Sequence, residues 1–260
     1  MSDFTDNLKP ASPSGPDILA LERSQSDVPV EELSKHLFPD NFLSRQQRIL
    51  LVLEQDSLFT KIKQQNLSRP ERYQLGLARA KKLRRLEDEH GWDAEDQVMS
   101  QYLCDDVSPY MVHFTMFPNT VREQGNEEQR AYWLPKIEAG EVVGCYAQTE
   151  LGHGSNVRGL ECQARWDPKT REFELHSPTL TARKWWNGTM GRTANHAIVV
   201  AQLLVPKSTD SSEYVSHGPH PFIVQIRDFK THQPLRGIAV GDIGPKYGSR
   251  PLNDPGQDIC

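Results

Sequence analysis

The sequence predicts an α+β protein in which a helical domain precedes a domain of β-strands. In the first half of the chain, apolar residues recur at spacings of three and four, which is the period of an amphipathic helix. After Gly140 this period ends, and short strand-like segments separated by turn residues follow. Because the helices come first and the strands afterwards, instead of alternating, we expect two segregated domains with a boundary near Gly140.

The helical domain is expected at residues 28–140, after a loosely ordered lead-in at 1–27 that is rich in Ser, Pro and Asp. Its first helix is expected after Ser44, because Ser44-x-x-Gln47 forms a capping-box pattern before an apolar run at 49–53. Further helices are predicted at 69–89, 94–103, 110–123 and 127–139, and Pro118 is a possible break in the third of these.

The β domain is expected at residues 141–248 and is followed by a polar tail at 249–260. Asp167-Pro-Lys-Thr170 supplies a four-residue turn between two of the strands, and a loop rich in Ser, His, Pro and Gly is expected at 205–219. The strands are predicted at 142–148, 161–166, 172–176, 182–186, 196–204 and 221–227.

Composition narrows the class of protein. The net charge of -5 argues against a general nucleic-acid binder, and the basic residues at 81–85 are better explained as a solvated helix face balanced by the acidic run at 87–89. No apolar run reaches the roughly 18 residues that a membrane span needs, and the N-terminus lacks a secretory signal pattern. The four cysteines have no C-x-x-C spacing, which is typical of a reducing compartment.

The most informative segment runs from Cys145 into the glycine-rich loop 149–159. Its pattern, Gly152-x-Gly154-Ser155, is neither a Rossmann fingerprint nor a nucleophile elbow, so spacing alone favours a structural turn over a ligand loop. A second dense run, Lys184-Trp-Trp-Asn-Gly-Thr-Met-Gly191, contains two adjacent tryptophans. On a strand these would point to opposite faces, and by themselves both are better explained as core residues.

The histidines do not form a metal site or a nucleophilic pair by spacing. His153, His176 and His196 show no H-E-x-x-H or comparable arrangement. Ser155 and His153 are too close in sequence to orient each other as nucleophile and base. His113, on an apolar segment, is better explained as a satisfied core histidine than as a ligand.

The two dense runs resemble the middle domain of the acyl-CoA oxidases, flavoenzymes that desaturate fatty acyl-CoA and pass the electrons to oxygen. The segments Gln148-Thr-Glu-Leu-Gly-His-Gly-Ser-Asn156 and Lys184-Trp-Trp-Asn-Gly188 carry most of the resemblance, and 221–227 and 237–248 extend it. The resemblance implies that 141–248 folds as an antiparallel β-barrel-like domain. It stops after Gly248, where members of the family continue into a C-terminal helical domain.

The resemblance also implies which residues contact the cofactor, FAD. The family places Thr149 against the flavin ring, where a hydroxyl suits the acceptors along the ring edge. Gly188 matches a glycine whose backbone approaches the flavin, and a missing Cβ permits that approach. Trp186 and Ser155 are the remaining expected cofactor-binding residues. Phe114, Met116 and Phe117 are weaker candidates for the wall of an acyl pocket.

The function that the resemblance implies is the first step of peroxisomal fatty acid β-oxidation. FAD-dependent desaturation of fatty acyl-CoA gives the trans-2-enoyl-CoA, and O2 is reduced to H2O2. A homodimer and a peroxisomal location are implied by the family, whereas Gln257-Asp-Ile-Cys260 is not a peroxisomal address. We expect no catalytic base here, because the family's glutamate lies in the C-terminal region. The alternatives are a non-catalytic fragment with weak or no ligand binding, and a dehydrogenase-type enzyme that uses a protein electron acceptor.

Overall fold

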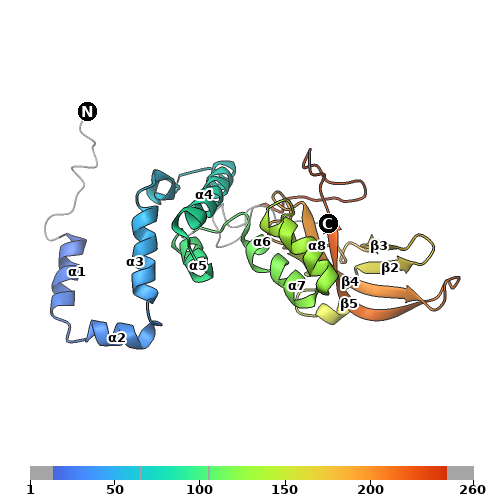
Figure 1. The fold of residues 1–260 in the computed structure, drawn as a ribbon, viewed down its shortest axis with the longest axis horizontal. Helices are drawn as coiled ribbons and strands as arrows, with labels where there is room; N and C mark the ends of the chain where they lie inside the picture. Colours follow the sequence, from blue (N-terminus) through green and yellow to red (C-terminus); the bar gives the residue numbers. More distant parts are fainter. Residues whose placement is uncertain (1–13, 65, 105, 245–260) are drawn as a thin grey trace. The chain divides into compact units, whose positions relative to one another are not determined.

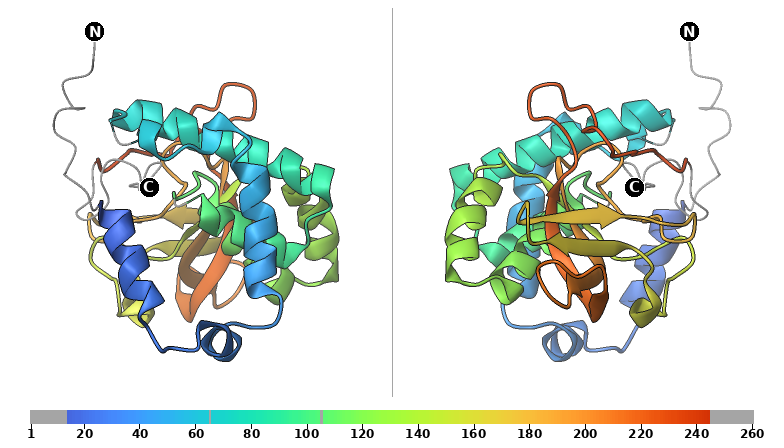
Figure 2. Two further views of the ribbon diagram at one scale, coloured as in Figure 1. Left: turned by 90° about the vertical axis from the view of Figure 1, so that its left-hand side faces the viewer. Right: turned by 90° about the vertical axis from the view of Figure 1, so that its right-hand side faces the viewer.

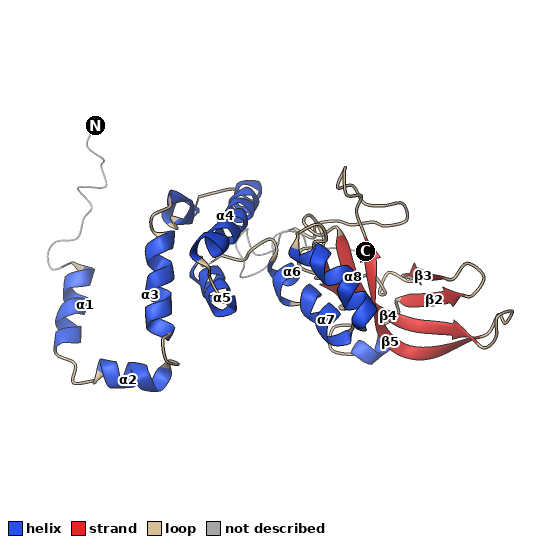
Figure 3. Cartoon of the chain, viewed as in Figure 1, coloured by secondary structure: helices blue, strands red, loops and turns tan. Residues whose placement is uncertain are grey.

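The computed structural model describes residues 14–64, 66–104 and 106–244 of the chain. It divides into two compact units, 1–49 and 50–260, which are described separately. Helices occupy the chain before β1 and strands follow it, as Figure 3 shows by colour. The order of helices before strands that the sequence predicts is therefore confirmed.

The first unit contains α1 (Gly15–Ser24), α2 (Val30–Leu37) and most of α3 (Phe42–Leu53). Within the lead-in predicted at 1–27, the structure has α1, which Ser14 caps with a reciprocal capping box to Asp17. The Ser44 capping box is wrong, since α3 begins two residues earlier and the Ser44 hydroxyl donates to the Asn41 carbonyl at 3.0 Å. Residues 1–13 lie outside the described part of the chain.

In the second unit the helices begin with α4 (Arg69–His90) and α5 (Ala94–Leu103), which follow the 3-10 turns Ser57–Phe59 and Ile62–Gln64. The Glu71 carboxylate accepts the backbone N–H of Ser68 at 2.7 Å, which fixes the start of α4. Gly91 ends it in the left-handed region, with φ of 61°. Both helices lie where the sequence predicts them.

The next predicted helix is broken. It consists of α6 (Met111–Thr115) and α7 (Phe117–Gln124), which meet at Met116. Pro118 lies in the first turn of α7, where its missing N–H costs no hydrogen bond. The alternative of a break near Pro118 is thus the correct one, and α8 (Glu127–Glu138) follows as expected.

Within the described residues, the strands form one five-stranded sheet that is mixed and open, so the prediction of an antiparallel barrel-like domain is wrong. The long central strand is β4 (His196–Pro206). Along one edge it pairs in parallel with β1 (Gly144–Ala147) and then with β2 (Gln163–Asp167), and β3 (Glu172–His176) pairs antiparallel with β2. The other edge of β4 pairs antiparallel with β5 (Tyr214–Gln225).

Two predictions within this region need correction. The loop predicted at 205–219 is shorter than expected, because β4 and β5 extend into both of its ends and pair as a long hairpin that 207–213 connect. Residues 182–186 are not a strand: only Lys184 makes a bridge, to Glu150. Trp186 at the end of this segment has a φ of 67°, and a residue in the left-handed region does not fit a regular ladder.

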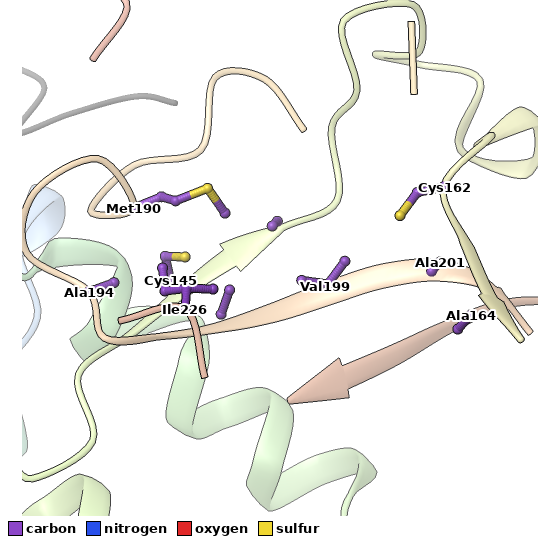
Figure 4. Close-up of a cluster of buried hydrophobic side chains, with 10 residues drawn as sticks. Cys145, Cys162, Ala164, Met190, Ala194, Val199, Ala201 and Ile226 are labelled. Carbon is purple, nitrogen blue, oxygen red and sulfur yellow. The ribbon is translucent and has the colours of Figure 1, made fainter. Parts of the chain in front are cut away.

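The sheet is covered on both faces, which explains why β4 is buried along its first six residues. On one face, α7 and α8 lie side by side and contribute Phe117, Val121 and Ile137 to a cluster with Ile198 (Figures 1 and 2). On the other face lies a cluster of small residues and sulfur-containing side chains. In Figure 4, Met190 and Cys145 lie at one end of β4 in this cluster, and Cys162 lies near its other end.

The boundary near Gly140 stays a prediction. Secondary structure changes type between α8 and β1, but α7 and α8 share a core with the sheet. Within the described residues, no helix combines the length and the apolar character that crossing a bilayer demands.

Candidate functional site

The glycine-rich loop begins where β1 ends and reverses direction within four residues. Glu150 and His153 exchange backbone hydrogen bonds, each N–H donating to the carbonyl of the other at 3.0 Å. A Cβ added to Gly152 would lie 2.8 Å from the Cβ of Thr181, so glycine is needed for this close approach. By contrast, nothing lies within 4 Å of a Cβ at Gly154. One glycine therefore serves packing, while the other faces open space.

The structure brings the loop and the tryptophan segment together. The N–H of Leu151 donates to the carbonyl of Arg183 at 2.9 Å, and the N–H of Trp185 donates to the carbonyl of Thr149 at 3.0 Å. The N–H of Gly152 donates to the carbonyl of Thr181 at 3.0 Å. Segments about 35 residues apart in sequence thus form one backbone-paired surface, which sequence spacing does not reveal.

Thr149 lies half-buried in this surface, with its side chain available for a ligand. Its backbone carbonyl accepts the hydrogen bond from Trp185. Its hydroxyl makes no hydrogen bond to any residue that the structure describes. A half-buried hydroxyl without a protein partner loses hydrogen-bonding capacity unless water or a ligand restores it. The Thr149 side chain therefore has the donor capacity that its expected role requires.

Trp186 has an unusual backbone for a bulky residue. Its φ is 67°, in the left-handed region, and Thr189 also has a positive φ, of 75°. Trp186 is 54% exposed, whereas the neighbouring Trp185 is half-buried. Strained backbone and an exposed aromatic ring in one segment are more typical of ligand sites than of packing. The two tryptophans therefore differ in burial, and the expectation that Trp186 contacts the cofactor stays a prediction.

The two other expected contact residues differ in their surroundings. A Cβ added to Gly188 would lie 2.9 Å from Cγ2 of Val112, so this glycine already has a packing reason to be small. Gly188→Val would therefore disturb α6 whether or not a ligand lies nearby. Ser155 is exposed, and no described hydrogen bond ties its side chain to the tryptophan segment.

The carboxylates of the loop are both occupied. Glu150 is fully buried and accepts hydrogen bonds from the N–H of Glu161 at 2.8 Å and from Nζ of Lys184 at 2.9 Å. Glu161 accepts hydrogen bonds from the hydroxyls of Thr179 and Thr181, which hold the pKa of its carboxyl below the usual value. Both side chains are thus engaged in hydrogen bonds, and the expectation that no catalytic base lies here stays a prediction.

Arg227 holds the turn that follows Gly188. Its buried guanidinium donates from Nη1 to the carbonyls of Met190 and Ala194, both at 2.5 Å, and from Nη2 to the carbonyl of Gly191 at 2.6 Å. The carbonyls of this turn do not pair with a neighbouring strand, so the guanidinium supplies the hydrogen bonds that they would otherwise lack.

We expect Arg227→Met to destabilise the chain by about 3 kcal/mol, because buried carbonyls lose charge-assisted hydrogen bonds. Chemical denaturation followed by tryptophan fluorescence measures the change. Arg158→Met, at an exposed arginine, is the matched control and should cost less than about 0.5 kcal/mol. Equal stability of the two variants would show that Arg227 does not support the turn.

Asp242 links this turn to α4. Its carboxylate accepts hydrogen bonds from Arg69 at 2.5 Å and from Nε of Arg192 at 3.2 Å. Burial pushes the pKa of Asp242 upward, but the hydrogen bonds from Arg69, Gly244 and Arg192 outweigh it and keep the pKa below its usual value. Sequence alone could not find this contact, because Arg69 and Asp242 are 173 residues apart.

The residues expected near an acyl pocket differ in position: one belongs to the hydrophobic core and another lines a cavity. Phe117 is fully buried and belongs to the core. His113 is buried, and its Nδ1 accepts the N–H of Gly144 at 3.2 Å, so the prediction of a satisfied core histidine is confirmed. Phe114 is half-exposed and lines a cavity, and Met116 is not among the lining residues.

That cavity has a volume of about 2100 Å³, and its lining comes from the end of α3 and from α4, α5, α6, α7 and α8. Its apolar lining includes Leu77, Val98, Met111 and Phe114. Charged side chains reach it as well, among them Lys81, Arg84 and Asp106. The sequence could not predict the cavity, since its lining comes from several helices that only tertiary packing brings together.

The residues that could hold a cofactor are therefore Thr149, Trp186 and the open backbone at Gly154. Sequence reasoning missed the buried pair of Glu150 and Lys184, because no pattern in the residues around either side chain marks it as buried. In the described ranges, no three His, Cys, Asp or Glu side chains gather in a way that could hold a metal ion.

Comparison with known proteins identifies relatives over nearly the whole chain. Residues 29–143 match the model of the acyl-coenzyme A oxidase N-terminal domain. Peroxisomal acyl-coenzyme A oxidase 1 of Arabidopsis thaliana is 38% identical over 245 residues, which are 92% of this chain and 35% of that protein. The chain thus spans about a third of the length of the curated relatives it matches.

Solved structures show the same similarity. Acyl-CoA oxidase 1 of Arabidopsis thaliana has a TM-score of 0.81 at 36% identity, over 93% of this chain and 36% of that one. Acyl-CoA oxidase-2 of Caenorhabditis elegans, solved with FAD, ascaroside-CoA and ATP, has a TM-score of 0.77 at 34% identity, over 92% of this chain and 36% of that one.

Proposed function

Because this chain carries the N-terminal domain of the acyl-CoA oxidases and matches the region that follows it in those enzymes, we propose that it forms the flavin-contacting part of an FAD-dependent acyl-CoA oxidase. The reaction would convert fatty acyl-CoA to trans-2-enoyl-CoA with reduction of O2 to H2O2. The peroxisome is the proposed location, since curated relatives are named peroxisomal. A homodimer is proposed as the form that acts.

The observation that carries the proposal is the paired surface of loop and tryptophan segment. Thr149 offers a hydroxyl without a described protein partner, and the exposed ring of Trp186 lies on the segment that is hydrogen-bonded to it. A planar cofactor with acceptors along its edge fits a hydroxyl donor beside a flat apolar wall. Gly154 leaves open space nearby in which a bulky group meets no Cβ. These residues fit FAD on chemical grounds.

The chain's own residues would bind and orient. FAD would supply the acceptor for the hydride that leaves the acyl chain. Thr149 would donate a hydrogen bond to the edge of the ring, and Trp186 would exclude water from one side of it. The apolar lining of the cavity, with Met111 and Phe114, supports an acyl chain as the substrate part that enters between the helices.

A second candidate is a binding unit without turnover of its own, and the occupied carboxylates favour it. Desaturation needs a base for the α-proton, and Glu150 and Glu161 are both engaged in hydrogen bonds. The 260-residue chain, with FAD and a long-chain acyl-CoA added, distinguishes the candidates by its flavin absorbance and by peroxide release. Bound flavin with peroxide favours the oxidase, and bound flavin without peroxide favours the binding unit. Reduction of a dye without peroxide would favour a dehydrogenase-type enzyme.

Thr149→Ala should weaken FAD binding about tenfold, which corresponds to roughly 1.4 kcal/mol for one lost hydrogen bond. Titration of FAD followed by its fluorescence measures the affinity. Thr149→Ser keeps the hydroxyl and should bind FAD within about twofold of the unaltered chain. If Thr149→Ala binds as tightly as Thr149→Ser, Thr149 does not contact the flavin.

A further inference from the structure

The geometry points to a positioning role for the buried ion pair of Glu150 and Lys184. We propose that this pair holds the loop 148–155 against the tryptophan segment 181–188 in the conformation that binds the cofactor. The inference rests on the proposed function, which it deepens by naming residues that act through their neighbours. Both side chains are at most 1% exposed, so neither touches a ligand itself.

Lys184 uses each of its three donor positions. Its Nζ donates to the Glu150 carboxylate at 2.9 Å, to the carbonyl of Gln148 at 3.1 Å and to the carbonyl of Val200 at 2.6 Å. One ammonium group therefore ties the end of β1, the loop and the centre of β4 to the residue that directly precedes the two tryptophans. An ammonium group has three donors and no acceptor, so all of its hydrogen-bonding capacity is used in this arrangement.

Glu150 is equally saturated. Besides the bond from Lys184, its oxygens accept hydrogen bonds from the N–H of Cys162 at 2.9 Å and from the N–H of Glu161 at 2.8 Å. Nδ1 of His153 lies 3.0 Å from the same carboxylate. The carboxylate thus connects the turn at 150–153 with the segment that leads into β2. The carboxylate has four hydrogen-bond partners, which come from three stretches of the chain. All four bonds can form together only when these stretches have one particular arrangement.

A stability role alone does not explain such a pair. Burying two charges costs free energy that their attraction scarcely recovers, and well-packed apolar residues of similar size often stabilise as well or better. Apolar contacts, however, do not fix the position of one segment relative to another, because dispersion attraction changes little when the segments shift slightly. Hydrogen bonds weaken steeply when their distance or angle changes. Thr149 is adjacent to Glu150, and Trp186 is two residues from Lys184, so the pair fixes the spacing of the two expected ligand contacts.

The double variant Glu150→Gln/Lys184→Met tests the proposal, because it removes both charges together and leaves neither buried alone. Leu83→Ala, at a buried residue of α4 that does not line the cavity, is the control for loss of stability as such. For each chain we would measure thermal unfolding by circular dichroism, hydrogen exchange of peptides that cover 148–156 and 181–188, and FAD affinity by fluorescence titration.

We expect the double variant to stay folded, to exchange those peptides at least about tenfold faster, and to bind FAD at least about tenfold more weakly. Leu83→Ala should unfold at a lower temperature and keep the exchange of both peptides and the FAD affinity of the unaltered chain. Wild-type exchange and FAD affinity in the double variant would overturn the positioning role. So would losses of the same size in Leu83→Ala, because they would trace the effect to stability.

Hydrogen exchange separates this inference from the proposed function. An unaltered chain that takes up no FAD would overturn the proposed function, and with it the link between the pair and the cofactor. Faster exchange in the double variant alone would then still support the pair as the element that sets the loop conformation. Unchanged exchange would overturn that role whatever the FAD titration gives.

Discussion

Gly144→Ala is expected to prevent the chain from folding stably. Gly144 is the first residue of β1, and a Cβ placed there would overlap the ring of Phe117. Phe117 is fully buried between α7 and the sheet, so the ring has no free space into which it could move. We expect a loss of at least about 3 kcal/mol, at the upper end of the range for overpacked cores. Denaturant titration of the purified chain measures it.

Two further variants make this prediction specific. Gly154→Ala adds a methyl group where nothing lies within 4 Å, and its stability should stay within about 0.5 kcal/mol of the unaltered chain. Gly144→Ala/Phe117→Leu replaces the ring by a smaller side chain and should recover part of the lost stability. A stable Gly144→Ala single variant would contradict the close packing of β1 on α7.

Acid is expected to destabilise the chain well above the range in which carboxylates titrate. Burial lowers the pKa of His113 from 6.5 to about 4, and burial together with the nearby Lys136 lowers the pKa of His196 to about 4. In the unfolded chain both histidines bind a proton near pH 6.5. Their stabilising contribution is therefore fully present above that pH and is lost as the pH falls toward 4, by about 3 kcal/mol for each histidine.

Unfolding free energies measured at intervals between about pH 7 and about pH 4.5 test this expectation. His113→Gln removes one of the two titrating groups, and its amide oxygen can still accept the N–H of Gly144. The variant should show roughly half the pH dependence of the unaltered chain over this window. A free energy of unfolding that does not change with pH would mean that both histidines have the same pKa in the folded chain as in the unfolded chain.

The helices of the second unit follow from the sequence because their signals are local. Residues 94–103 and 172–176 were predicted with the bounds that the structure gives them, since caps, apolar period and a tight turn all lie within a few residues. The type of sheet was not predictable in this way. Strand pairing is decided by partners far apart in sequence, and the parallel pairing of β1 with β4 joins residues about 50 apart.

The candidate site also combines features that local sequence indicates with features that only tertiary structure reveals. The resemblance to the acyl-CoA oxidases implies Thr149 and Trp186 as cofactor contacts, and the structure brings their segments together through the hydrogen bond between Trp185 and Thr149. The sequence does not predict the contact between Glu150 and Lys184, which joins the same two segments. A buried charge leaves no periodic signature, so only the tertiary structure identifies its partner.

The central place of β4 has a consequence for how the protein is made. β1 and β2 leave the ribosome before β4, yet each pairs with it in parallel, and they do not pair with each other. A nascent chain that stops short of residue 196 therefore has a loop and a tryptophan segment but no strand on which to align them. Such contacts between distant residues form slowly and expose apolar strands in the meantime. Binding competence should thus appear late in synthesis and abruptly, once the β4–β5 hairpin has emerged, and chaperones that shield strand edges would act before that point.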